Sequence, residues 1–78
     1  MTTNKSTTIR VDSSMIDSAT YNHEHNQLLV QFKNNKSKYI YTDVPGFLFH
    51  GLFAAESKGK FIHKNIINAG FKYKRVQP

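Results

Sequence analysis

The chain has 78 residues, 38% of them hydrophobic, and a formal net charge of +6. This length allows one domain with a small core, because a chain of this size buries only about 60–65% of its unfolded surface. The absence of cysteine excludes disulfides and thiolate chemistry and agrees with a reducing compartment. No apolar run is long enough to span a membrane and no signal-peptide core is visible, so we expect a cytoplasmic protein without a membrane partner.

The first elements that the pattern predicts are three short strands. Residues 1–8 are small and polar, and we expect them to form a flexible lead to a single domain over residues 9–76. Alternation of apolar and polar residues predicts strands at about residues 17–22, 28–33 and 38–44. Because the connections between these strands are short and polar, the strands should form an antiparallel meander.

Two helices and a last strand are predicted to follow. Pro45 ends the sheet and suits the first turn of a helix over about residues 45–56, and a second helix is expected at about residues 60–68. Gly51 weakens the first helix by about 1 kcal/mol relative to Ala, which indicates close packing against the second helix. Residues 71–76 alternate like an edge strand. The expected fold is α+β, with a three- or four-stranded antiparallel sheet packed by a C-terminal helical pair.

The surplus of positive charge lies at the C-terminal end of the chain. From Ser57 onward there are six basic residues and no acidic one, whereas the chain up to Glu56 has five of each. This asymmetry favours a polyanionic partner. A basic tail that only raises solubility is the alternative.

Four short motifs occur together along the chain. They are Ser-Ser at residues 13–14, Tyr-x-Tyr at 39–41, Val-Pro at 44–45 and Ser-Lys-Gly-Lys at 57–60. In this combination the chain resembles the KTSC domain, over residues 11–75. That family is named for its occurrence at the C-terminus of some lysyl-tRNA synthetases, and it also occurs as short free-standing bacterial and phage-type proteins. The resemblance implies a fold and, through the synthetase fusions, suggests RNA binding.

The Ser-Lys-Gly-Lys motif is a candidate phosphate site. Ser57 would cap the second helix, and Gly59 would let an anion approach backbone N–H groups beside Lys58 and Lys60. The same lysines would also be favourable just after the first helix, so a turn with solvated lysines is the alternative. The other basic residues expected to contact phosphate are Lys64, Lys72, Lys74 and Arg75.

Aromatic residues are candidate partners for unpaired bases. Basic and aromatic residues alternate over residues 71–76, which suits a single-stranded nucleic acid and equally suits an edge strand with its rings packed inward. Tyr39 and Tyr41 either face the helices or form a stacking platform. The candidate stacking residues are Tyr39, Tyr41 and Tyr73.

These features predict a non-enzymatic module that binds nucleic acid, RNA rather than DNA, with weak sequence specificity. The alternative is a protein-interaction module that docks on a larger host protein through Phe47 and Phe53 on the apolar helix, together with the basic patch. A small phosphorylated ligand held at Gly59 is a third hypothesis.

Histidine, serine and carboxylate residues are present, but their pattern predicts no catalytic residue. Nothing resembles a strained nucleophile turn or an oxyanion loop. His23 and His25 flank Glu24, yet no nearby residue completes the three or four ligands that zinc needs. We therefore expect no enzyme, no cofactor and no metal ion.

Overall fold

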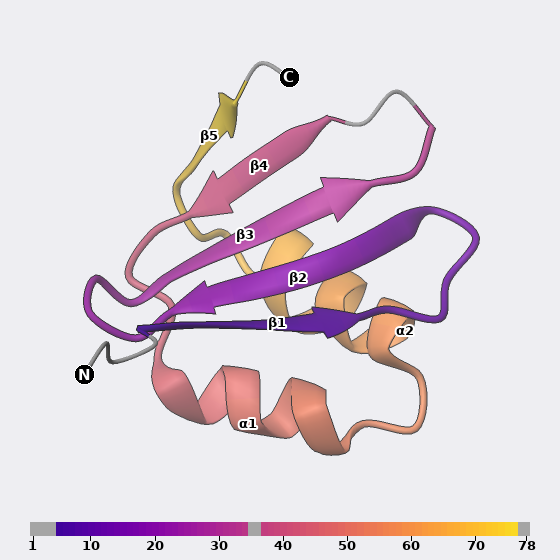
Figure 1. The fold of residues 1–78 in the computed structure, drawn as a ribbon, viewed down its shortest axis with the longest axis horizontal. Coiled ribbons are helices and arrows are strands. Elements are labelled where there is room, and N and C mark those ends of the chain that lie inside the picture. Colours follow the sequence, from indigo (N-terminus) through magenta and orange to yellow (C-terminus); the bar gives the residue numbers. More distant parts are fainter. Residues whose placement is uncertain (1–4, 35–36, 77–78) are drawn as a thin grey trace.

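The computed structural model describes residues 5–34 and 37–76. Its elements, in chain order, are β1 (Ser6–Arg10), β2 (Ile16–Asn22), β3 (Gln27–Phe32), β4 (Lys38–Tyr41), α1 (Gly46–Ala54), α2 (Lys58–Ile62), the π-helical turn η1 (His63–Ile67) and β5 (Tyr73–Val76). The strands form one antiparallel sheet in the order β1-β2-β3-β4-β5, and the helices lie against one of its faces (Figure 1). The expected α+β class and antiparallel arrangement are confirmed.

The predicted number of strands is wrong, because the sheet has five strands rather than three or four. The unexpected strand is β1, whose backbone pairs with β2 from Ser6 opposite Asn22 to Arg10 opposite Ser18. Residues 6–8 were expected in a flexible lead, and residues 1–4 of that lead lie outside the described residues. Threonine and isoleucine suit a strand, but only one position of β1, Ile9, packs against the core, so the strand has almost no apolar pattern.

The helical pair differs from the prediction in its bounds, and it is not C-terminal. It lies between β4 and β5, and β5 is the last strand that the alternation of residues 71–76 predicted. The second helix begins at Lys58, before the expected start, because the preceding Ser57 is extended and its hydroxyl accepts the N–H of Lys60. Gly59 therefore lies inside α2, and the break between the helices falls at Ala55 to Ser57.

The core fills the space between the helices and the sheet. Alternate residues of β2 and β3 are buried there against apolar residues of the three helical segments; the set includes Ala19, Tyr21, Leu28, Val30, Phe49, Leu52, Ile62 and Ile66. A Cβ added to Gly51 would come within 2.9 Å of the ring of Phe61 in α2. The close helix packing expected at this glycine is therefore confirmed.

Candidate nucleic-acid interface

The lysines of the Ser-Lys-Gly-Lys motif have different roles. Lys58 is half-buried, and its ammonium group donates to the carbonyl oxygen of Ala55 at 3.3 Å, just beyond the end of α1. A cation in this place satisfies a carbonyl that the helix leaves without an intrahelical partner. Lys60 is exposed, while its backbone N–H is 3.4 Å from the hydroxyl of Ser57. The position of Lys58 therefore matches the alternative in which this lysine stabilises the turn between the helices and binds no anion.

Gly59 packs against a different part of the chain rather than opening to solvent. It is buried, and a Cβ at this position would lie 2.9 Å from Cβ and 3.0 Å from Oγ of Ser13. The Ser13 hydroxyl in turn accepts the backbone N–H groups of Met15 and Ile16, at 3.1 and 3.3 Å. The close approach that Gly59 allows is therefore used by Ser13, which fills space that a phosphate would need.

The basic residues near the C-terminus lie along an edge strand. Lys72, which directly precedes β5, and Tyr73, Lys74 and Arg75 within it are all exposed, and among the strands that the structure describes β5 pairs with β4 alone. Lys74 is opposite Ile40, on the sheet face without helices, whereas Tyr73 is opposite Tyr41 and Arg75 opposite Tyr39 on the other face. The register thus separates Lys74 from the aromatic face, as the alternation of residues 71–76 predicted.

The three candidate stacking tyrosines form one cluster with unequal exposure. Tyr41 is only 4% exposed, Tyr39 is half-buried and Tyr73 is 61% exposed. The ring of Tyr73 is tilted against both of the others, with centroid distances of 5.5 Å. Burial, and then the neighbouring hydroxyls of Tyr73 and Tyr39, raise the pKa of Tyr41. A platform that uses Tyr41 is therefore wrong, because its ring faces the helices, and Tyr73 is the ring open to a ligand.

A pocket lies beside this cluster, at the turn between β3 and β4. It has a volume of about 220 Å³ and is lined by Phe32, Asn34, Ser37 and Tyr39. The guanidinium of Arg75 donates to the Ser37 hydroxyl at 3.2 Å, which places a cation at the pocket. Phe32, Asn34 and Ser37 were not among the site residues predicted from the sequence. The alternation of β3 and β4 puts the two rings on one face, but only the pairing with β5 adds the cation.

The structure does not bring all the basic candidates together. Gly59 packs on the connection between β1 and β2, while β5 lies at the opposite edge of the sheet (Figure 1). Lys58 and Lys60 are thus separated from the β5 residues, and Lys64 lies between them in sequence, on η1 and exposed. The basic residues therefore do not form the single patch that we expected. Lys58 and Lys60 lie near one edge of the sheet, and the basic residues at β5 lie at the other edge.

The two phenylalanines proposed for protein docking are both on the solvent side of α1. Phe47 is 72% and Phe53 60% exposed. His50 is also exposed, while Phe49 and Leu52 of the same helix are buried. α1 therefore presents apolar groups on both its inner and its outer side. Its apolar surface is wider than packing on the sheet requires.

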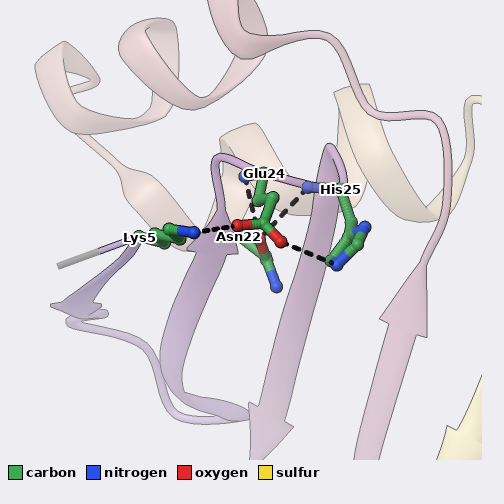
Figure 2. Close-up of polar contacts among 4 residues, drawn as sticks. All are labelled: Lys5, Asn22, Glu24 and His25. Atoms are coloured by element: carbon green, nitrogen blue, oxygen red, sulfur yellow. Dashed lines mark hydrogen bonds and ion pairs between the residues drawn. The ribbon is translucent and has the colours of Figure 1, made fainter. Parts of the chain in front are cut away.

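The histidines near the turn between β2 and β3 support local structure. The Asn22 side chain accepts the backbone N–H groups of Glu24 and His25, and the Glu24 carboxylate pairs with Lys5 and with His25 (Figure 2). His23 instead bonds the Thr7 hydroxyl at 2.8 Å. Across residues 5–34 and 37–76, no three His, Asp or Glu side chains come together in a way that would hold a metal ion.

Comparison with known proteins gives one consistent result. The family model described as the KTSC domain matches residues 12–73. The crystal structure of a KTSC domain protein from Yersinia pestis is similar, with a TM-score of 0.78 and 28% sequence identity, covering 92% of this chain and 99% of that one. No curated protein matches the chain. Within the part of the chain that the structure describes, no helix is long and apolar enough to cross a membrane.

Proposed function

This chain belongs to the KTSC domain family, and from this premise we propose that it is a non-enzymatic module that binds single-stranded RNA along the edge of its sheet formed by β5. The observation that carries the proposal is the composition of that edge. Lys72, Lys74 and Arg75 are exposed there around the exposed ring of Tyr73, and neither β4 nor β5 contains an acidic residue.

The cations of β5 suit a flexible phosphate backbone. Lysine and arginine that neutralise phosphates release counterions, and this supplies most of the affinity for a nucleic acid when no base is read. Lys74 projects on one face of the strand and Arg75 on the other. A strand that passes along the edge can therefore meet positive charge from both faces, without entering a deep groove.

Tyr73 gives the same edge an aromatic surface. Its ring is held at 5.5 Å from those of Tyr39 and Tyr41 while most of it remains exposed. A ring supported from behind loses little freedom when a base stacks on it, and every base offers a flat face for such stacking. The combination favours single-stranded over double-stranded ligands and implies weak sequence specificity. The occurrence of the family on lysyl-tRNA synthetases favours RNA over DNA.

Fluorescence anisotropy of a labelled single-stranded RNA tests the proposal. Two double charge reversals of equal size are compared: Lys72→Glu with Lys74→Glu, and Lys58→Glu with Lys60→Glu. We expect the first pair to abolish binding and the second to weaken it much less, since Lys58 is engaged with Ala55. Equal loss of affinity in both variants would show that β5 is not the main contact surface for RNA. Absence of salt-sensitive binding by the unmodified protein would refute the proposal.

A second candidate function is supported by the exposure of Phe47 and Phe53. Large apolar side chains on the outer side of a helix are typical of surfaces that contact another protein. Docking of a larger host protein on α1 would bury both rings, and the basic residues would meet an acidic rim. Such binding should weaken in Phe47→Ala and keep its salt dependence, whereas RNA binding should keep its affinity in that variant.

A further inference from the structure

Resting on the proposed RNA-binding function, we infer that the pocket lined by Phe32, Asn34, Ser37 and Tyr39 holds one base of the bound strand, with Arg75 at the adjoining phosphate. The base site lies next to the phosphate contacts of β5 and includes Asn34 and Ser37, which lie between β3 and β4.

The size and walls of the pocket suit a single flat ring. Its volume of about 220 Å³ is below the roughly 300–1,000 Å³ that is usual for sites of drug-sized ligands. Phe32 and Tyr39 contact each other edge to face, with centroids 5.6 Å apart and an interplanar angle of 73°. A base would therefore lie over one of these rings rather than insert between them, and stacking of this kind tolerates any base.

The polar lining can recognise the edge and the phosphate of a nucleotide. Asn34 is exposed, and its amide offers both a donor and an acceptor to the edge of a base. Arg75 donates one hydrogen bond to Ser37, and its guanidinium has further N–H donors in a planar fork that matches phosphate oxygens. The contact with Ser37 restrains this long side chain at the pocket before a ligand arrives.

The pocket is continuous with the edge strand. Arg75 is opposite Tyr39 in the register, and Tyr73 is the next residue of β5 on the same face. The Tyr73 ring is 5.5 Å from that of Tyr39. One base in the pocket and its neighbour on Tyr73 would therefore leave the connecting phosphates beside the β5 cations.

A second pocket, on the open face of the sheet, lacks these features. It has a volume of about 170 Å³ and is lined by Ser6, Thr20, Asn22, Gln27, Leu29 and Ile40. No ring and no cation is among those residues. A third pocket, of about 180 Å³, has a ring and a cation in Phe32 and Lys33, but the carboxylate of Asp17 also lines it and would repel a phosphate. Of the three, the pocket lined by Phe32, Asn34, Ser37 and Tyr39 is the one that combines rings and a nearby cation without a carboxylate.

The test compares two labelled strands of equal length and charge: a short single-stranded RNA of mixed sequence and a ribose-phosphate strand without bases. Their dissociation constants are measured at one salt concentration by anisotropy. We expect the unmodified protein to bind the RNA at least about fivefold more tightly, because stacking of each base contributes about fivefold to a hundredfold. Asn34→Ala should reduce this ratio about threefold or more by removing a hydrogen bond to the base, and Tyr39→Leu should reduce it further.

Matched variants separate this inference from the proposed function. Asn68→Ala changes another exposed asparagine, outside the pocket, and should keep the ratio. Lys72→Gln should weaken binding of both strands equally. Equal binding of the two strands by the unmodified protein overturns the base site, and base stacking on Tyr73 with it, and leaves only the phosphate interface in place. A ratio that persists in both pocket variants but falls in Tyr73→Leu also overturns it. Binding of neither strand overturns the inference and the proposed function together.

Discussion

Gly59 and Ser13 are in direct contact, and a methyl group at Gly59 would come within 2.9 Å of the Ser13 Cβ. This contact joins the first turn of α2 to the connection between β1 and β2. It also links two of the motifs that characterise the chain, Ser-Ser and Ser-Lys-Gly-Lys. The glycine is therefore required by packing between two distant parts of the sequence, whatever the lysines beside it bind.

The contact predicts the sign of a glycine substitution. Gly59→Ala should destabilise the protein by about 1 kcal/mol, because the overpacking cost of about 1–3 kcal/mol exceeds the gain in helix propensity of about 1 kcal/mol. Urea unfolding measures the change. Gly46→Ala in α1 is the control, since its added Cβ would meet only the Tyr21 hydroxyl at 3.8 Å, and it should not destabilise.

A double-mutant cycle identifies the partner of Gly59. Ser13→Gly removes the atoms that the new methyl group would meet, so Gly59→Ala should cost less in that background than in the natural one. An alanine at Gly59 that stabilises the natural chain, as it does at an ordinary exposed helical site, would contradict the packing role.

The order of most elements was predictable because residues that end or separate helices and strands are clear in the sequence. Pro45 separates sheet from helix, and alternating residues mark β2, β3 and β5. β4 ends earlier than expected, at Tyr41, because the chain turns at Asp43, which has a positive φ of 56°. β1 was missed because a strand that contributes one residue, Ile9, to the core leaves almost no apolar pattern.

The candidate site was only partly predictable, because the pairing register between strands determines which residues come together in it. The basic and aromatic residues of β5 were visible as a pattern. Their partners were not, since nothing local indicates that Arg75 lies opposite Tyr39 and bonds to Ser37. Likewise, the run Ser57 to Lys60 looks like an anion site until Ser13 is seen to fill the space over Gly59. The secondary-structure propensity and the charge of a segment can be seen in its own sequence. Its neighbours in the fold are determined by pairing and packing with distant segments.

Because two tyrosines are buried, we expect the free energy of unfolding to be lower at alkaline pH. Burial raises the pKa of Tyr21 and of Tyr41 above the ordinary tyrosine value. An unfolded tyrosine loses its proton at about pH 10, while the folded protein holds these protons to higher pH. The free energy of unfolding should therefore be at its full value below about pH 10 and fall as the pH rises from there towards the folded pKa values.

Tyr21→Phe tests this assignment. At neutral pH it should lower the free energy of unfolding by about 1 kcal/mol or slightly more, because the Tyr21 hydroxyl donates to the Val44 carbonyl at 2.6 Å. Above about pH 10 its stability should decline less steeply than that of the natural protein, since one of the two tyrosines no longer ionises. Urea midpoints across this pH range give both quantities, and parallel curves for the two proteins would show that Tyr21 contributes nothing to the alkaline loss.

The outer side of α1 should be dispensable for folding. Phe47→Ser should change the free energy of unfolding by no more than about 0.5 kcal/mol, because the side chain is largely exposed and packs against little. Phe49→Ala, on the inner side of the same helix, should cost about 3–5 kcal/mol. Thermal unfolding of the two variants provides the comparison. A large loss in Phe47→Ser would show that the ring is structural and would remove the main reason for a docking role.

The cations of β5 predict how RNA binding depends on salt. Each phosphate neutralised on a single strand contributes about −0.7 to the slope of log K against log salt concentration. Contacts from Lys72, Lys74 and Arg75 therefore predict a slope near −2. Arg75→Gln should make the slope less negative by about 0.7 and weaken binding of all sequences alike. Lys58→Gln is the matched control and should leave the slope unchanged, because Lys58 is bonded to Ala55. A slope that changes with Lys58 and not with Arg75 would place the phosphates at the start of α2 and refute the interface on β5.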